Sequence, residues 1–281
     1  MLSDTAPMTD PIAPPSTDDF TLATQVEPDG DGRYVATIPD GWQQGRGAFG
    51  GLVLGALARA MLRAEPDAGR VLRSLSGEIV GPVLPGPADI VVKALRRSNA
   101  VSTWEAWLSQ GPELLARASA VMGLPRSSDR DGTELPPPSM GAPWESVDVI
   151  PIGPPMGPHF ARMYEFRSTG PWPFSGADRP EASGWVRLRK PVALGVPEVI
   201  GLMDSWWPAT FALELAPRPM ATVAFTLQLL ADPASLDPAR PLYYRSYAAA
   251  SRQGFVVEKR ELWTPQGELV AMNQQTFVII K

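Results

Sequence analysis

Carboxylate, amide and hydroxyl side chains, together with backbone N–H groups, are the main chemical resources of this chain. Its 281 residues include no cysteine and a single histidine, His159. The absence of cysteine excludes thiolate nucleophiles and Cys-based zinc sites, and one histidine cannot build a multi-histidine metal centre. We therefore expect no metal and no cofactor. His159 lies in a proline-rich stretch, and we expect no chemical role for it.

Asp204 is the carboxylate with the most unusual neighbours. It is followed closely by Trp206, Trp207 and Phe211. Burying an acid costs free energy unless it is paired, so a carboxylate kept among large apolar residues is a candidate general base. The alternative is a structural acid that caps a helix or binds backbone groups. Trp206 could line a substrate cavity or belong to the core.

Three polar residues on expected strands could assist such a base. Gln274 and Gln275 are adjacent, so only one of them faces inward. An inward Gln275 could orient a water or a substrate carbonyl, or it could be an ordinary buried amide. Thr226 could bind a water, although a hydroxyl is no base near neutral pH, and it could equally be a plain strand residue. Tyr247 could donate a hydrogen bond from an inner wall or be a core aromatic.

Glycines mark the start of an apolar helix expected over residues 49–63. The N-terminus of a helix presents free N–H groups and a partial positive charge. Gly50 and Gly51 would let a carbonyl oxygen approach that backbone. We therefore consider the Gly51 N–H as an oxyanion donor. The alternative is that both glycines only permit close packing of the helix on a sheet.

The elements that must position these residues recur in two halves. The first half contains expected strands at 20–26 and 33–38, the helix at 49–63, and strands at 71–83, 88–95, 102–109 and 113–122. The second half contains a strand at 184–188, a helix at 197–213 that Pro208 should interrupt, and strands at 221–230, 242–249, 255–263 and 268–280. Trp107-x-x-Gln110-Gly111 in the first half matches Trp263-x-x-Gln266-Gly267 in the second. This order indicates a tandem repeat.

Proline separates the two repeats. Of 32 prolines, four lie in residues 1–19 and twelve in residues 125–180. We therefore predict a disordered leader over 1–19, a first unit over 20–124, a proline-rich connector over 125–180 and a second unit over 181–281. A strand-rich unit with one apolar helix predicts an α+β fold in which an antiparallel sheet wraps around a central helix.

Four segments resemble the acyl-CoA thioesterase II family of double hot-dog proteins. They are GRGAFGGLVLGALARAM (45–61), LRSLSGEIVGPVLPG (72–86), MDSWWPATFAL (203–213) and PQGELVAMNQQTFVI (265–279). The resemblance covers about residues 20–281. It implies a tandem double hot-dog fold, an acyl-CoA or related acyl ligand as partner, and hydrolysis of the thioester to the acid and free CoA.

The resemblance also implies a site in which Asp, Thr and Gln surround the attacking water. The Gln falls on Gln275, the Asp on Ala224, and the Thr on or near Tyr247. Alanine cannot deprotonate a water, so we expect Asp204 to replace the missing base. Loss of the acid equally favours a protein that binds an acyl ligand without hydrolysing it. A different enzyme on the same fold is the third hypothesis.

Composition excludes two other classes of partner. The net charge is −5 and the pI is about 5.1, which gives no electrostatic footprint for nucleic acid. No apolar stretch is long enough to span a membrane. We therefore expect a cytoplasmic protein, and the family resemblance suggests a homo-oligomer.

Overall fold

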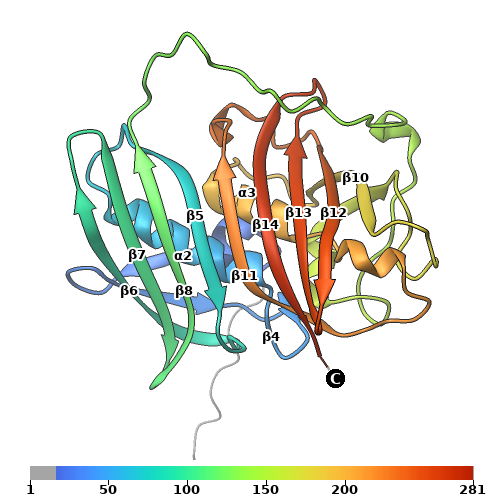
Figure 1. Cartoon of the computed structure of the whole chain (residues 1–281). Helices are drawn as coiled ribbons and strands as arrows, with labels where there is room; N and C mark the ends of the chain where they lie inside the picture. Colours follow the sequence, from blue (N-terminus) through green and yellow to red (C-terminus); the bar gives the residue numbers. More distant parts are fainter. Residues whose placement is uncertain (1–16, 281) are drawn as a thin grey trace, which may run out of the picture.

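The computed structural model describes residues 17–280, so most of the predicted leader lies outside the described residues. The elements of the first unit are α1 (Phe20–Ala23), β1 (Val26–Pro28), β2 (Arg33–Ile38), β3 (Gln43–Gln44), β4 (Gly47–Ala48), α2 (Gly50–Ala64), β5 (Val71–Ile79), β6 (Gly86–Arg97), β7 (Val101–Gln110) and β8 (Glu113–Gly123). Figure 1 shows α2 against the sheet that these strands begin.

The second unit repeats this order of elements. It contains β9 (Tyr164–Ser168), β10 (Glu181–Leu188), α3 (Val196–Asp204), β11 (Met220–Leu229), β12 (Leu242–Arg252), β13 (Phe255–Trp263) and β14 (Leu269–Ile279). Four short 3-10 helices accompany them: η1 (Trp144–Ser146), η2 (His159–Met163), η3 (Ala209–Ala212) and η4 (Pro233–Ser235).

Both units share one 12-stranded antiparallel sheet. Its order is β1-β2-β6-β7-β8-β5-β11-β14-β13-β12-β10-β9, and β5 pairs with β11 where the two units meet. The helices α2 and α3 pack against each other on one face of this sheet (Figure 1). The predicted α+β tandem double hot-dog fold is therefore confirmed.

Two expected elements differ from the sequence analysis. The strand expected at 20–26 begins instead as α1, because the Asp19 side chain accepts a hydrogen bond from the Leu22 N–H and caps a helical turn. The range predicted as connector contains β9, which pairs with β10 and extends the sheet of the second unit. Pro208 has the expected effect, since α3 ends at Asp204 and only η3 follows it.

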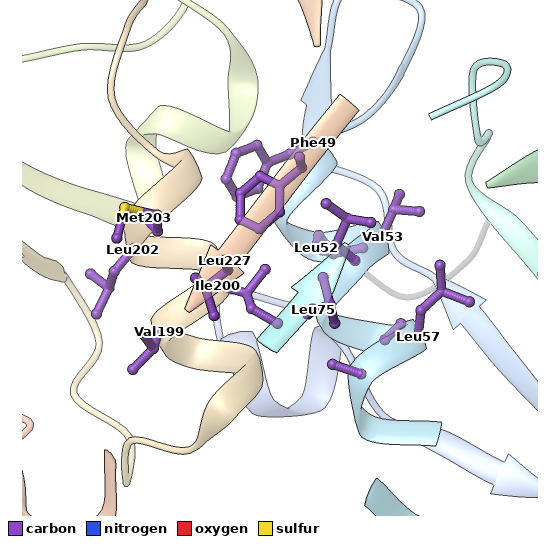
Figure 2. Packing of buried hydrophobic residues seen from close by; sticks show 14 of the residues in the cluster. Phe49, Leu52, Val53, Leu57, Leu75, Val199, Ile200, Leu202, Met203 and Leu227 are labelled. Atoms are coloured by element: carbon purple, nitrogen blue, oxygen red, sulfur yellow. The ribbon is translucent and has the colours of Figure 1, made fainter. Parts of the chain in front are cut away.

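The two helices bury their contacting faces in one shared core. Figure 2 shows side chains of α2, its N-cap residue and α3 together with one residue each of β5 and β11: Phe49, Leu52, Val53, Leu57, Leu75, Val199, Ile200, Leu202, Met203 and Leu227. Full burial of such a side chain contributes about 1.5–3 kcal/mol. One ion pair crosses the same contact, because Arg59 of α2 lies 2.8 Å from the Glu198 carboxylate of α3. The units are thus joined by helices as well as by strands.

Close packing at Gly201 of α3 makes the junction sensitive to volume. A Cβ atom added at Gly201 would lie 2.5 Å from the buried Phe20 ring and 2.8 Å from the Tyr164 hydroxyl. We predict that Gly201→Val lowers the free energy of unfolding by about 2–3 kcal/mol, because overpacking forces neighbours to move. Gly132→Val, at an exposed position with open space, is the matched control and should change it by less than about 0.5 kcal/mol. Urea denaturation checks both values, and equal effects would contradict the prediction.

Candidate functional site

The candidate site lies where the two units meet. Asp204 is the last residue of α3, and the N-terminus of α2 approaches it from the first unit. Its carboxylate is almost enclosed, with 7% of the residue exposed. Gly50, Trp207 and Thr222 nearby are only partly buried, so the surface is close. The site therefore depends on residues from both repeats.

A chain of hydrogen bonds holds the Asp204 carboxylate from β14. The Gln275 Nε2 donates to Asp204 Oδ1 at 2.7 Å. The Thr222 Oγ1 donates in turn to Gln275 Oε1 at 3.1 Å. Because the hydroxyl occupies the amide oxygen, the amide nitrogen is directed to the carboxylate. Thr222, Gln275 and Asp204 thus form one connected polar group.

Strand alternation explains why Gln275 rather than Gln274 joins this group. Along β14 the buried positions include Ala271, Asn273 and Gln275, whereas Gln274 is exposed. Successive side chains of a strand point to opposite faces of the sheet. Gln275 therefore faces the helices and Gln274 faces outward.

The N-terminus of α2 reaches the carboxylate through two glycines. A Cβ atom at Gly50 would lie 3.0 Å from Asp204 Oδ2, and one at Gly51 would lie 3.0 Å from Asp204 Cβ. The Gly51 N–H contacts the carboxylate closely enough to lower its pKa. Phe49 precedes the helix and makes no side-chain cap. The Leu52 and Val53 N–H groups bond to the Phe49 carbonyl and the Gly51 N–H meets Asp204, so Gly50 carries the first-turn N–H that is left for a ligand.

Two buried charges of β13 complete the surroundings of Asp204. Arg260 is 1% exposed, and its Nη1 lies 3.7 Å from Asp204 Oδ1. The same nitrogen donates to the Met203 carbonyl at 3.1 Å. The Arg260 Nε donates to Glu258 Oε1 at 2.8 Å. Asp204 is consequently the end of a buried carboxylate–guanidinium–carboxylate row.

These surroundings tune Asp204 for proton transfer. Burial raises the pKa of Asp204 to about 6. The Arg260 charge, the Gln275 hydrogen bond and the Gly51 N–H all oppose this rise, whereas Glu258 adds to it. A carboxylate with a pKa near 6 is ionised at neutral pH and still basic enough to accept a proton from water. The arrangement can therefore hold and deprotonate a water.

Thr226 and Ala224 do not belong to this group. They lie on the outer face of β11, where Thr226 stands opposite the exposed Gln274. A shift in strand register between Thr222 and Ala224 inserts an extra residue, so strict alternation fails at this point. Of the two roles considered for Thr226, the structure contradicts water binding at this site and leaves a plain strand residue, and Thr222 takes that place. Nothing in the sequence pattern marks this bulge.

The other residues considered in the sequence analysis lie outside this polar group, on the outer face of the sheet, in the core or at the surface. Tyr247 is 38% exposed and lies opposite Lys259 on the outer face of the sheet, so it is neither an inner-wall donor nor a core aromatic. Trp206 is 2% exposed and stacks on Tyr244 at 5.0 Å between ring centroids. It packs in the core beyond Asp204. His159 is exposed in η2.

Residues 17–280 contain neither a metal-binding cluster nor a membrane-spanning helix. No group of three or more His, Cys, Asp or Glu side chains is arranged to hold a metal there. Within the same residues, no helix is long and apolar enough to cross a membrane.

The fold and the site define a protein built from two hot-dog units with one polar site at their junction. Family models agree: the acyl-CoA thioesterase N-terminal domain matches residues 38–123, and the C-terminal domain matches residues 133–279. The chain belongs to the acyl-CoA thioesterase family. A comparison with curated proteins gives no match.

Solved structures show the same fold at low identity. A hot dog fold protein of unknown function from Alicyclobacillus acidocaldarius is 22% identical, with a TM-score of 0.85 and coverage of 93% of this chain and 98% of that one. A putative thioesterase II from Thermobifida fusca is 23% identical, with a TM-score of 0.81 and coverage of 96% and 100%. A tesB protein from Mycobacterium avium subs paratuberculosis is 17% identical, with a TM-score of 0.78 and coverage of 95% and 100%.

The raised pKa of Asp204 predicts a cost in stability at neutral pH. The folded protein binds the Asp204 proton more tightly than the unfolded chain does. The stabilisation that this proton gives the folded state is therefore present below about pH 4 and is lost as pH rises through about 6. Asp204→Asn removes the titration. We predict that the free energy of unfolding of Asp204→Asn minus that of wild type is higher at pH 8 than at pH 4 by on the order of 3 kcal/mol.

Urea denaturation at both pH values measures this difference. Asp131→Asn, at an exposed loop position, is the control and should behave alike at both. An Asp204→Asn effect that does not change with pH would contradict the prediction.

Proposed function

We propose that this protein hydrolyses acyl-CoA thioesters to the free acid and CoA, with Asp204 as general base. The observation that carries the proposal is the buried Asp204 carboxylate, bonded to Gln275 and faced by the N-terminus of α2. Family membership supports the substrate class. The pKa of about 6 supports proton transfer at neutral pH.

In the proposed reaction, Asp204 accepts a proton from a water while the water oxygen attacks the thioester carbonyl carbon. Gln275 holds the carboxylate with one N–H and has a second N–H to direct the water. Thr222 keeps that amide in the required orientation through its hydrogen bond to Oε1. The three side-chain types are those that the family resemblance leads us to expect.

Charge on the carbonyl oxygen is stabilised in this proposal by the N-terminus of α2. Backbone N–H groups and the helix dipole favour negative charge at this position. The Gly51 N–H already contacts Asp204, so we assign the main donor role to the Gly50 N–H. The tetrahedral intermediate then collapses, the carbon–sulfur bond breaks, and the proton held by Asp204 passes to the CoA sulfur.

The hypothesis of a ligand-binding protein without hydrolysis relied on the missing acid at Ala224. That side chain lies on the outer face of β11, away from the helices. An acid is nevertheless present at the junction, in Asp204. This arrangement favours hydrolysis, and an assay with a panel of acyl-CoA chain lengths separates hydrolysis from binding.

Substitutions at the polar group provide the direct test. We predict that Asp204→Asn and Gln275→Ala each lower kcat by about 100-fold to 10,000-fold, because each removes part of the general-base arrangement. Thr222→Ala should lower kcat less, because it acts through Gln275. Free-thiol detection during turnover of the acyl-CoA panel measures these effects.

Thr226→Ala is the matched control, since it removes the same hydroxyl from the outer face of the same strand. It should leave kcat unchanged. Binding of acyl-CoA by wild type without any release of thiol would reject hydrolysis, and equal losses at Thr222 and Thr226 would reject the assigned site.

The pH dependence of wild-type turnover offers a second test. Because the base must be ionised, kcat/KM should rise with pH, reach half of its maximum near pH 6 and level off above about pH 7. Initial rates with a single acyl-CoA between pH 4.5 and 8.5 check this curve. A flat profile through pH 6 would exclude a base with the pKa of Asp204.

A further inference from the structure

Glu258 and Arg260 are two charged residues in the interior of β13. They are two residues apart on the same strand face and are 0% and 1% exposed. Removing charges from water is expensive, and a buried ion pair often stabilises a fold no better than apolar residues would. Their position next to Asp204 suggests a role beyond packing.

These two side chains hold both ends of the segment that carries Asp204. Arg260 donates to the Met203 carbonyl at 3.1 Å, immediately before Asp204. Glu258 Oε2 accepts from the Ala209 N–H at 2.6 Å, at the start of η3. Asp204 ends α3, and the chain from Ser205 to Ala209 lies outside the helix and has few regular backbone hydrogen bonds. Its conformation is therefore fixed largely from β13.

We propose that Arg260 and Glu258 act as a positioning pair. Arg260 holds the Asp204 carboxylate in place and favours its ionised form, and Glu258 weakens the effect of the Arg260 charge on that carboxylate. The proposal rests on the proposed function of Asp204 as general base. Arg260 alone would keep Asp204 ionised but make it a poor proton acceptor. Glu258, bonded to the guanidinium at 2.8 Å, offsets part of that positive charge.

Few other charged or titratable groups surround Asp204. Besides the pair on β13, the buried phenols of Tyr244 on β12 and Tyr164 on β9 lie near it. The Glu198 carboxylate of α3 helps to raise the pKa of Tyr164. Burial raises the pKa of both phenols, so they are neutral near pH 6. The α2 N-terminus contributes a dipole and no titrating side chain. Charge control of Asp204 therefore falls mainly to Arg260 and Glu258.

The first unit shows how the same strand positions serve a purely structural acid. Aligning Trp107 with Trp263 places Ser102 and Trp104 of β7 at the positions of Glu258 and Arg260. Both donate to the buried Glu65. Burial alone would raise the pKa of Glu65, but these two hydrogen bonds, the Asp67 N–H and the Arg70 charge together outweigh it and the pKa is lowered. Arg70 and Arg97 also lie 3.7 Å from the Glu65 carboxylate, but they come from outside these two strand positions. In the second unit the strand itself supplies both the charge of Arg260 and the counter-charge of Glu258.

Opposite shifts in two variants test the pair. We expect Arg260→Met to move the titration of Asp204 to higher pH by about one unit or more, because a charge 3.7 Å away is lost. Glu258→Gln should move it to lower pH, because Arg260 is then unopposed. The double variant should lie between the two, and Arg260→Lys should restore much of the wild-type value.

The shifts are read in two ways: from the Asp204 carboxyl carbon by ¹³C NMR titration, and from the acid limb of the kcat/KM profile. Thermal unfolding of each variant identifies those that fold. The double variant, which buries no unpaired charge from the pair, provides the comparison if a single variant fails to fold. In that case the pH at which Asp204 titrates in the double variant must differ from the pH at which it titrates in Arg260→Lys.

Failure of this inference is distinct from failure of the proposed function. If wild type releases no thiol but the NMR titrations move in opposite directions, the pair still controls Asp204 and the hydrolase assignment is rejected. If wild type turns over but the variants lose only thermal stability, with unchanged titrations, the positioning role is overturned. Shifts of the same sign in both single variants would also overturn it.

Discussion

The close approach of the α2 N-terminus to the Asp204 carboxylate is the contact on which the rest of this structure depends. It requires glycine at positions 50 and 51, because a Cβ atom at either would lie 3.0 Å from Asp204. It also requires that α2 and α3 lie side by side, which the pairing of β5 with β11 arranges. The duplicated sheet therefore matters to the site chiefly because it brings one helix of each unit together.

A carboxylate at this contact is unfavourable in itself, and the surrounding residues show how the fold compensates. Gln275 and the Gly51 N–H stabilise the ionised form, and Arg260 supplies an opposite charge. Even so, burial dominates and keeps the pKa raised. Fuller compensation lowers the pKa of a buried acid, as at Glu65, so the proposed base must remain partly unsatisfied. Stability and proton transfer thus make opposing demands on the same side chain.

Much of the fold could be predicted because it depends on patterns that the sequence repeats. The apolar helix after Phe49, the strands of both halves and the inward position of Gln275 or its neighbour all follow from periodicity. Asp204 was identified by its apolar neighbours. Thr226 shares a strand face with Ala224, as alternation requires, but one extra residue between Thr222 and Ala224 turns that face away from Gln275 and leaves no mark in composition. The turn of α1 likewise depends on a single cap at Asp19. Bulges and caps are decided by tertiary contacts, which periodicity does not contain.

Duplication would suggest two sites, but the local chemistry favours one. The N-terminus of α3 is already occupied, because Glu198 accepts from the Gly195 N–H at 3.0 Å, whereas α2 has no side-chain cap. The two units also differ at the position of the amide. Gln275 stands opposite Glu258 in the second unit, whereas the residue opposite Ser102 in the first unit is Met122. The first unit therefore contributes the helix terminus that meets Asp204 but no amide, and the second contributes the acid and the amide while its own helix terminus is capped by Glu198. Only the junction of the two units combines them, so each chain holds one complete arrangement.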